Sequence, residues 1–387
     1  MSLESPYALT DAEQAILELV TRVAREKLEP NAEAIDREER FPEESLRLFK
    51  ELGLMGCHLP EEYGGGGLRS LVFCRILEEV ARKCANSANI LSQQDFAATP
   101  ILLAGTPQQK QKYLPALAQG EKLAAFALTE PNAGSDVSSI ETRAEFRGDG
   151  YVINGSKQFI TWGNMAHVMT VFCKTDPSRG HKGISAILVE RGTPGLSLGR
   201  LEKKLGMGGS PTAQIIFEDC RVPRENLLGE LHGGFTIAMN CLERGRVGVA
   251  AMAVGLAQGA IDAAARYARE RRQFGKSIAE FQAIQFIFAD MATAVEASRQ
   301  LLYCACHEAD QGGPNANRLS AMAKLLASDS AMEVTTNAVQ VLGGYGYLKD
   351  FPLERMFREA KVMQIVEGTN QIQRLIIGRE VLFPKHC

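Results

Sequence analysis

The residue best suited to acid–base chemistry is Glu367, in the segment Val366-Glu367-Gly368-Thr369. Its neighbours Ile365, Val366 and Gly368 are apolar, and a carboxylate among apolar groups has a raised pKa. Such a group accepts a proton near neutral pH, which makes Glu367 a candidate general base. The alternative is a structural role, because acidic residues are common in the first turn of a helix.

A second candidate site is the turn in the segment FALTEPNAGSD, which starts at Phe126. A short strand leads into Pro-Asn-Ala-Gly, a sequence typical of turns. The turn would expose backbone N–H groups and the hydroxyls of Thr129 and Ser135 to an incoming ligand. Taken alone, it is also an ordinary surface turn.

A third candidate is Arg271, which lies with Phe274 and Gln282 in a predicted helix–turn–helix stretch. A guanidinium suits a pyrophosphate because its planar fork binds pairs of oxygens. A lone surface arginine is a weak candidate until other residues support it.

Several nucleotide-binding and catalytic motifs fail on spacing. Gly275-Lys276-Ser277 resembles the end of a P-loop, but Glu270 stands where the first glycine belongs, and the segment lies in a helical pattern. The glycine clusters at 64–67, 206–209 and 343–346 lack the G-x-G-x-x-G spacing after a strand, and no segment matches G-x-S-x-G. Rossmann-type nucleotide binding and serine hydrolysis are therefore disfavoured.

No metal site is predicted. Cys304, Cys306 and His307 are close in sequence, but on a helix these spacings point around the cylinder instead of toward one ion. The nine cysteines are scattered and odd in number, which suits a reducing compartment.

The composition indicates a large globular protein with a small-molecule ligand. With 387 residues, 45% of them hydrophobic, the chain can bury a core of two or three packed domains. Its 43 basic and 46 acidic residues nearly cancel and form no single-sign tract, so neither nucleic acid nor a membrane surface is an expected partner.

The N-terminus and the hydropathy favour a cytoplasmic protein. The start lacks the features of a secretory signal or a transit peptide, so the expected location is the cytoplasm, or the mitochondrial matrix if a presequence has been removed. The smoothest apolar run, 247–260, is short for a membrane span and predicts a buried helix without membrane insertion.

Hydrophobic periodicity gives the order of elements. Thr10 and Glu13 have capping-box spacing before an apolar helical stripe, and Pro30 is expected to end that helix. Helical patterns continue to about Gly120, and β-rich runs follow at 151–153, 167–174, 184–189 and 214–217. Long helices are expected at 235–268, 281–311 and 318–342, and a last one around 371–382. This order predicts an α-β-α protein whose C-terminal half is a helical bundle.

Seven sequence blocks in register resemble the acyl-CoA dehydrogenase family over nearly the whole chain. They are PEEYGGGG from Pro60, FALTEPNAGSD from Phe126, NGSKQFITWG from Asn154, LERGRVGVAA from Leu242, RRQFGKSIAEFQ from Arg271, QVLGGYGY from Gln340 and VEGTNQIQRLIIGR from Val366. The resemblance implies an α+β fold with an N-terminal α-helical domain (1–121), a middle β-barrel-like domain (122–233) and a C-terminal four-helix bundle (234–387).

The resemblance also implies FAD as the cofactor, held from two sides. Flavin contacts are expected from the middle domain, at Phe126, Leu128, Thr129, Gly134, Ser135, Phe159, Ile160 and Thr161. Phe159 stands where many relatives have Trp, which leaves a smaller aromatic platform. Thr369 and Gln371 would support the flavin and the adjoining phosphates. A neighbouring subunit would hold the nucleotide with Arg271, Phe274, Gln282, Gln340 and Gly344, so a homotetramer is expected.

The implied reaction is α,β-dehydrogenation of an acyl-CoA to the 2-enoyl-CoA. Glu367 would remove the proton next to the thioester carbonyl while the flavin takes a hydride, and electrons would pass to electron-transfer flavoprotein. The thioester carbonyl would be polarised by the Glu367 N–H and a flavin ribityl hydroxyl. Two alternatives remain: an acyl-CoA oxidase that uses O2, and a catalytically silent member that serves as a binding scaffold.

The expected substrate contacts bear on specificity. Some relatives carry the base on another helix, but the corresponding residue here is Gly245, and Glu243 and Arg246 would contact the CoA end or fix the helix. Ser135 and Gly368 complete the expected contacts. Val366 replaces a bulkier aromatic residue, which should widen the pocket for a branched or alicyclic group among the short or medium acyl chains.

Asp95 lies where relatives usually have small or apolar residues lining the acyl pocket, as do Gln93 and Gln94. A buried carboxylate is costly unless it is paired or functional. Asp95 therefore faces solvent or caps a helix, pairs structurally, or binds or deprotonates part of the substrate. The third role resembles family members that act on alicyclic acyl-CoAs.

Overall fold

The first helix begins at the predicted capping box. In the computed structural model, which describes residues 7–383, α1 spans Asp11–Val23. Thr10 Oγ1 accepts a hydrogen bond from Glu13 N (3.2 Å), and the Glu13 carboxylate accepts one from Thr10 N (2.9 Å). A π-helical turn and a 3-10 turn follow, so Pro30 lies in a tight turn after the helix and is not its last residue.

Five more helices complete the N-terminal part and confirm its predicted helical character. They are α2 (Ala32–Arg37), α3 (Glu43–Glu51), α4 (Ser70–Ala81), α5 (Ala85–Ala104) and α6 (Pro107–Ala118). Both α4 and α5 are buried over most of their length, because each packs against the C-terminal helix α7.

The middle part is an eight-stranded sheet, which confirms its predicted β character, although β2, β6 and β8 were not among the expected runs. Its strands are β1 (Ala124–Ala127), β2 (Arg143–Arg147), β3 (Gly150–Thr161), β4 (Val168–Lys174), β5 (Ile184–Glu190), β6 (Leu196–Leu201), β7 (Thr212–Pro223) and β8 (Leu227–Leu228). Their order is β6-β7-β3-β2-β4-β5-β8, and β1 pairs in parallel with β4. The two strands that carry expected flavin contacts, β1 and β3, lie near each other, and β1 also contacts helix α5.

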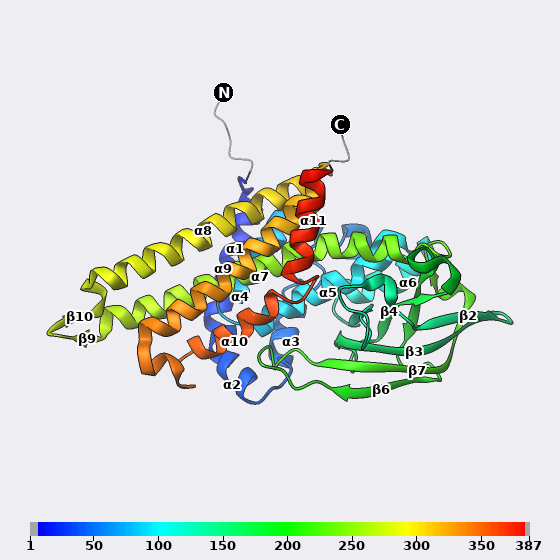
Figure 1. Ribbon diagram of the computed structural model, residues 1–387, viewed down its shortest axis with the longest axis horizontal. Coiled ribbons are helices and arrows are strands. Elements are labelled where there is room, and N and C mark those ends of the chain that lie inside the picture. Colours follow the sequence, from blue (N-terminus) through cyan, green and yellow to red (C-terminus); the bar gives the residue numbers. More distant parts are fainter. Residues whose placement is uncertain (1–6, 384–387) are drawn as a thin grey trace, which may run out of the picture.

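The C-terminal part is a bundle of long helices. Helices α7 (Gly234–Glu270), α8 (Gln282–Asp310) and α9 (Ala316–Leu342) lie side by side, and α10 (Leu353–Met363) and α11 (Asn370–Leu382) pack on α9. Figure 1 shows this bundle extending away from the sheet. Helix α10 was not predicted, although it is amphipathic and begins directly after Pro352.

The segment between α7 and α8 corrects a prediction. The stretch around Gly275-Lys276-Ser277 is not helical but a small hairpin of β9 (Arg272–Gln273) and β10 (Lys276–Ser277). Phe274 (φ 52°) and Gly275 (φ 82°) form its tip in left-handed conformations, which no helix permits. The P-loop reading remains excluded.

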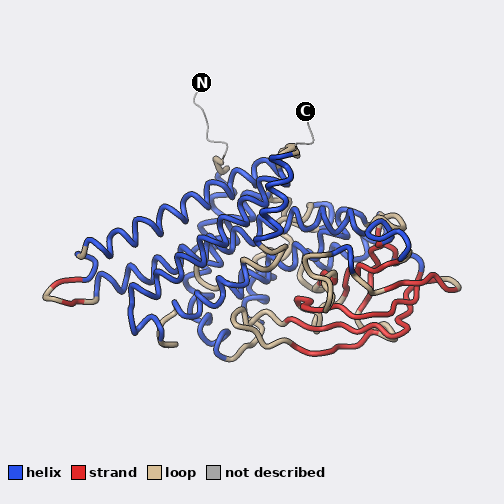
Figure 2. Tube along the Cα trace, in the orientation of Figure 1, coloured by secondary structure: helices blue, strands red, loops and turns tan. Residues whose placement is uncertain are grey.

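Two helices join the bundle to the sheet. Helix α5 contacts β1 and β4 as well as α7, and α7 contacts β4 and β5. In Figure 2 the strands of the eight-stranded sheet occupy one end of the molecule, and the long helices extend to the other end, where the short β9–β10 hairpin lies; α5 and α7 run from the bundle toward the sheet. Helix α7 is long and apolar enough to cross a membrane, but 78% of its most apolar window is buried in the protein, so it is a core helix of the bundle.

Candidate active site

Glu367 lies in the short connection between α10 and α11, in an unusual backbone conformation. Its φ is 54° and that of Gly368 is 88°, so two consecutive residues are left-handed. Thr369 then caps α11 by accepting a hydrogen bond from Ile372 N (3.4 Å). A non-glycine residue with positive φ is strained, and such strain is typical of functional sites.

The Glu367 carboxylate faces the interior of the protein. Its Oε2 is buried and has no hydrogen-bond partner among residues 7–383. Burial raises the pKa of Glu367 to about 8, while Arg246 and Lys324 pull it part of the way down. A carboxyl group with this pKa is partly ionised near neutral pH and can accept a proton there.

The apolar surroundings come from distant helices. Ile365 and Val366 are 53% and 38% exposed, so these chain neighbours do not bury the carboxylate as the sequence suggested. A Cβ atom on Gly245 of α7 would lie 2.8 Å from Glu367 Oε2 and 2.8 Å from the Phe96 ring of α5. The carboxylate therefore lies against the bare backbone of α7, next to an aromatic ring.

Arg246 is buried, unlike a typical salt-bridging residue on a helix surface. Its Nη1 donates to Asn317 Oδ1 (2.7 Å), and its Nε is buried with no partner in the described chain. Burial lowers the pKa of Arg246, and Glu243, Glu367 and Glu380 oppose that change. The structure thus brings Arg246 close to the candidate base, and Glu243 lies partly exposed one turn earlier.

Sequence reasoning missed two polar residues that hold the Glu367 turn. Gln373 Nε2 donates to the carbonyls of Glu367 (3.1 Å) and Gly368 (2.9 Å), and Lys324 Nζ donates to Gly368 O (2.9 Å). Both side chains are fully buried. The available signal was Lys324 on the apolar face of a helical pattern, between Ala323 and Ala327, where a charge requires a partner.

The expected flavin contacts of β1 and β3 are held together by a buried ion pair. Lys157 Nζ bonds Glu130 Oε1 (2.7 Å) and donates to Leu128 O (3.0 Å). Gln158 N donates to Thr129 O (2.8 Å), so the two segments lie directly side by side.

Phe159 projects from this pair of segments as an aromatic platform. It has a φ of 59° and is 61% exposed, whereas Ile160 is buried and Thr161 is partly buried. Gly134 and Ser135 are exposed on the neighbouring turn. Phe126 is instead partly buried and packs between the Phe96 and Phe172 rings, with centroid distances of 4.7 and 4.8 Å.

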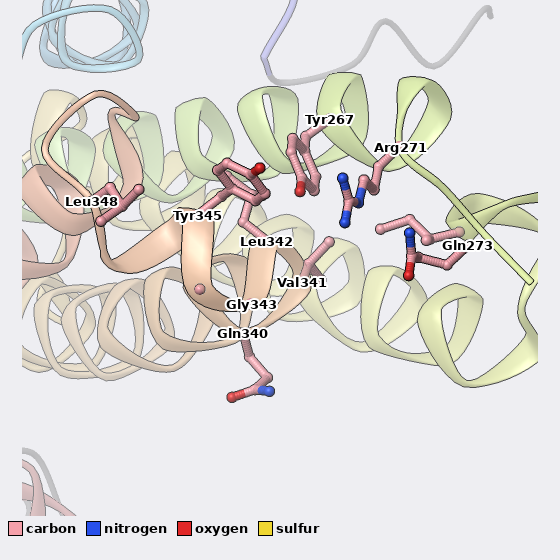
Figure 3. A pocket seen from close by; sticks show the side chains of 11 residues that line it. Tyr267, Arg271, Gln273, Gln340, Val341, Leu342, Gly343, Tyr345 and Leu348 are labelled. Atoms are coloured by element: carbon pink, nitrogen blue, oxygen red, sulfur yellow. The ribbon is translucent and has the colours of Figure 1, made fainter.

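A second group of expected cofactor residues lines a cavity of about 520 Å³ at the far end of the bundle. Arg271, Gln340 and Gly344 belong to it, and the Arg271 guanidinium lies 5.5 Å from the centre of the Tyr345 ring. Figure 3 shows Tyr267 and Tyr345 beside Arg271, and the Gln340 amide pointing away from them.

Phe274 and Gln282 are not part of this cavity lining. Phe274 is 94% exposed at the hairpin tip, and Gln282 is exposed at the start of α8. The β9–β10 hairpin beside this cavity projects from the end of the bundle that faces away from the sheet, so one chain does not bring this group and the sheet residues together (Figure 1).

Asp95 is paired. Its Oδ1 lies 3.0 Å from His58 Nδ1, and His58 Nε2 lies 3.3 Å from Ser70 Oγ. The imidazole stacks on Phe73 with ring centres 4.9 Å apart. Burial lowers the pKa of His58, but Asp95 outweighs that effect and raises the pKa above its ordinary value. Both side chains line a small cavity that Phe96 and Gly245 also line, and these two residues lie next to the Glu367 carboxylate. Gln94 is structural, since its buried amide donates to Leu117 O and Lys122 O (both 2.8 Å).

Within residues 7–383, no three or more His, Cys, Asp or Glu side chains are grouped so that they could hold a metal ion. Cys304, Cys306 and His307 lie on α8.

The fold and the site define a class of enzyme in which a buried carboxylate lies between helices of the N-terminal and C-terminal parts, with a sheet between these parts in the sequence. Models of three domains match the chain: acyl-CoA dehydrogenase N-terminal domain (10–121), middle domain (125–220) and C-terminal domain (232–382). The chain therefore belongs to the acyl-CoA dehydrogenase family, whose members are oxidoreductases acting on acyl-CoA.

Two similar proteins differ in the reaction for which they are named: one is a reductase and the other a dehydrogenase. Acryloyl-CoA reductase (NADH) of Anaerotignum propionicum is 48% identical over 97% of this chain and 96% of its own length. Cyclohex-1-ene-1-carbonyl-CoA dehydrogenase of Geobacter metallireducens is 48% identical over 97% of this chain and 99% of its own length.

Among solved structures, butyryl-CoA dehydrogenase of Megasphaera elsdenii is similar with a TM-score of 0.94 and 43% identity, over 97% of this chain and 99% of that chain. The similarity confirms the predicted three-part fold.

Proposed function

We propose that the protein dehydrogenates an acyl-CoA thioester between its α and β carbons, with Glu367 as the base. The observation that carries the proposal is the Glu367 carboxylate itself: it is buried against Gly245, its Oε2 has no hydrogen-bond partner in the described part of the chain, and its pKa is raised to about 8. An α-proton of a thioester is weakly acidic, so its removal requires a base that is poised near neutral pH.

The residues around Glu367 supply the other requirements of this step. The backbone N–H of Glu367 donates no hydrogen bond within residues 7–383, so it can polarise the thioester carbonyl. Arg246 and Lys324 stabilise the ionised carboxylate before it takes the proton. Gln373 fixes the turn by binding its two carbonyls, so the base keeps its orientation.

The chain has the features that FAD requires. Phe159 offers an exposed aromatic face next to the turn with Thr129 and Ser135. At the other end, a Cβ on Gly343 or Gly344 would meet no atom within 4 Å, so these backbones permit close approach, and Arg271 supplies a cation for a pyrophosphate. Bound FAD would supply the acceptor for the hydride from the β carbon.

A complete FAD site requires two chains in this proposal. Arg271 directly precedes the β9–β10 hairpin, which projects from the bundle away from the sheet that carries Phe159, so in this proposal a neighbouring subunit brings its Arg271, Gln340 and Gly344 to the flavin held here (Figure 1). Phe274 and Gln282, exposed beside that cavity, are available to the same neighbour. We propose a homotetramer that passes electrons to electron-transfer flavoprotein. A similar chain, at 47% identity and a TM-score of 0.95, occurs in a structure described as the electron transferring flavoprotein of Acidaminococcus fermentans.

The proposed substrate is a short or medium acyl-CoA with a branched or alicyclic group. Val366 is partly exposed beside the base, and the polar pair of His58 and Asp95 shares a small cavity with Phe96, so a long alkyl chain that entered this cavity would meet charge. A relative named for cyclohex-1-ene-1-carbonyl-CoA agrees with a compact ring. Asp95 is then the second acid of the acyl pocket, held by His58.

The first experiment is an anaerobic visible spectrum of the purified protein, titrated with butyryl-CoA, isobutyryl-CoA and the cyclohexane- and cyclohexene-carboxyl-CoA thioesters. Bleaching of a flavin band is expected with at least one compact acyl group. Glu367→Gln should keep the bound FAD and lose bleaching by about 10²- to 10⁴-fold. Glu333→Gln, which changes an exposed acid on α9, is the matched control and should behave as wild type. Bleaching of Glu367→Gln at the wild-type rate would place the base elsewhere.

Asp95→Asn tests the acyl pocket separately. The ratio of rates with alicyclic and straight-chain acyl-CoAs should change, because the variant removes the charge while it keeps the size. An unchanged ratio would make Asp95 a structural partner of His58.

The comparison with acryloyl-CoA reductase (NADH) makes the reverse direction a second candidate. The same site would then return a proton from Glu367 to the α carbon. Rates with reduced and oxidised acceptor flavoprotein distinguish the two directions, and peroxide formed without an added acceptor would identify an oxidase.

A further inference from the structure

A buried lysine lies beneath the turn that carries Glu367. Lys324 is fully buried on α9, and its Nζ donates to Gly368 O (2.9 Å) and to Asn370 Oδ1 (2.8 Å). These acceptors belong to the residue that follows the base and to the first residue of α11. The Lys324 ammonium group therefore connects α9 to the residues that follow Glu367 in the chain.

The hydrogen bonds continue to the near side of the turn. Asn370 Nδ2 donates to Asp329 Oδ1 (2.6 Å), one turn along α9 from Lys324. The same carboxylate oxygen accepts a hydrogen bond from Gln364 Nε2 (2.7 Å), just after α10. Both ends of the connection that contains Glu367 are thus fixed to α9.

The backbone conformation of Glu367 explains why this connection needs hydrogen bonds at both ends. Glu367 is in a left-handed conformation, which a non-glycine residue keeps only when its surroundings over-determine it. Gln373 binds the same carbonyl of Gly368 from α11, at 2.9 Å. Lys324 on α9 and Gln373 on α11 together donate hydrogen bonds to the Glu367 and Gly368 carbonyls.

Lys324 also brings a charge to the base. The charged groups facing Glu367 are Arg246 from α7 and Lys324 from α9, and the Cys241 thiol of α7 faces it too. Behind these cations, Glu243 and Glu380 face Arg246, and Asp329 faces Lys324. Burial lowers the pKa of Lys324 to about 8, and the Glu367 and Asp329 carboxylates limit that fall. Below this pH Lys324 is charged, and it stabilises the ionised form of Glu367.

We infer that Lys324 is a positioning residue for the proton transfer: it holds the strained Glu367 turn through Gly368 and Asn370, and its charge sets the pH range in which Glu367 acts as a base. This inference rests on the proposed role of Glu367. No part of it requires Lys324 to touch the substrate or the cofactor.

The test is the pH profile of Lys324→Met in the FAD-loaded protein. Two rates are followed from pH 6 to 10: flavin bleaching by the best acyl-CoA, and exchange of that substrate's α-hydrogen for solvent deuterium by mass spectrometry, which reports proton removal alone. Without the cation, Glu367 ionises at higher pH. We expect both profiles to move upward by about one pH unit, which makes each rate about tenfold lower at pH 7. FAD affinity should stay within about twofold of wild type, because the effect is local.

Three variants complete the test. Lys324→Arg restores the charge and should move the profile back toward wild type, which a purely structural role does not predict. Lys361→Met removes an exposed lysine whose Nζ donates to Gln364 Oε1 (2.8 Å) in the same region, and its profile should match wild type. Lys324→Gln keeps an amide group that can donate to Gly368 O. It replaces Lys324→Met in the test if the methionine variant does not fold.

The outcomes separate the two proposals. If wild type bleaches and Glu367→Gln does not, the base is established, and an unshifted profile in folded Lys324→Met then overturns only the inference on Lys324. Failure of both the Met and Gln variants to fold would also overturn it, since Lys324 would then serve core stability. If Glu367→Gln bleaches normally, the proposed function itself fails first.

Discussion

Gly245 of α7 lies directly against Glu367 of the α10–α11 connection: a Cβ atom at residue 245 would lie 2.8 Å from Glu367 Oε2. Gly245, which leaves the alternative base position on α7 without a carboxylate, is therefore also the residue that makes room for the Glu367 carboxylate. No real Cβ comes so close without displacement of its neighbour, so the size of residue 245 controls where the base lies.

Gly245→Ala should therefore impair proton removal without unfolding the protein. The added methyl group displaces the carboxylate or Phe96, and a misplacement of this size costs about a hundredfold in the bleaching rate. Gly378→Ala on α11 is the matched control, because a Cβ there meets no atom within 4 Å. A Gly245→Ala enzyme with wild-type bleaching would show that the carboxylate is not held against α7.

The raised pKa of Glu367 predicts a pH-dependent stability. The folded pKa of about 8 exceeds the unfolded value of 4.5, so the folded state holds its proton longer. The contribution of Glu367 to stability is complete below pH 4.5 and declines as pH rises through 8. Glu367→Gln does not titrate, so its melting temperature relative to wild type should rise between pH 5 and pH 8. Glu333→Gln is the control. If the melting-temperature difference between Glu367→Gln and wild type stayed constant over this pH range, the raised pKa of a buried Glu367 would be contradicted.

The Lys157–Glu130 pair should matter to both stability and FAD. Lys157 is fully buried, and Glu130 also accepts hydrogen bonds from Glu141 N and Thr142 N. Lys157→Met leaves a buried carboxylate without its cation, which costs about 3–5 kcal/mol. Urea denaturation should show this loss, and a spectroscopic titration should show weaker FAD binding as Leu128 and Thr129 lose support. Lys182→Met, an exposed substitution in the same domain, should cost less than about 0.5 kcal/mol.

Arg271 should contribute to FAD binding through an assembled neighbour. Loss of a hydrogen bond to a charged group costs about 1.5–3 kcal/mol, so Arg271→Gln should weaken FAD binding by roughly ten- to a hundredfold. Its effect should require the oligomer, so sedimentation and FAD titration are measured on the same samples. Arg269→Gln, exposed near the end of α7, should bind FAD as wild type does. Equal affinities in the two variants would remove Arg271 from the cofactor site.

The sequence by itself determined the kinds and order of the elements, because helical and strand periodicities are local. The capping box at Thr10, the β-rich runs of the middle part and the four long helical patterns of the C-terminal part all appear in the structure, whereas the short helix α10 and the hairpin at Gly275 escaped prediction. The sequence also made Glu367 a candidate base, since a carboxylate in an apolar segment is conspicuous, and that role stays a prediction.

Only the tertiary structure decided what surrounds that carboxylate. Its apolar wall comes from α5 and α7 and its cations from α7 and α9, over a hundred residues away for Arg246, and not from Ile365 and Val366 beside it. The pairing of Asp95 with His58 and the position of the β9–β10 hairpin relative to the sheet were likewise beyond the sequence. Burial and charge act through space, so they depend on which helices meet, and the packing of the whole chain settles that.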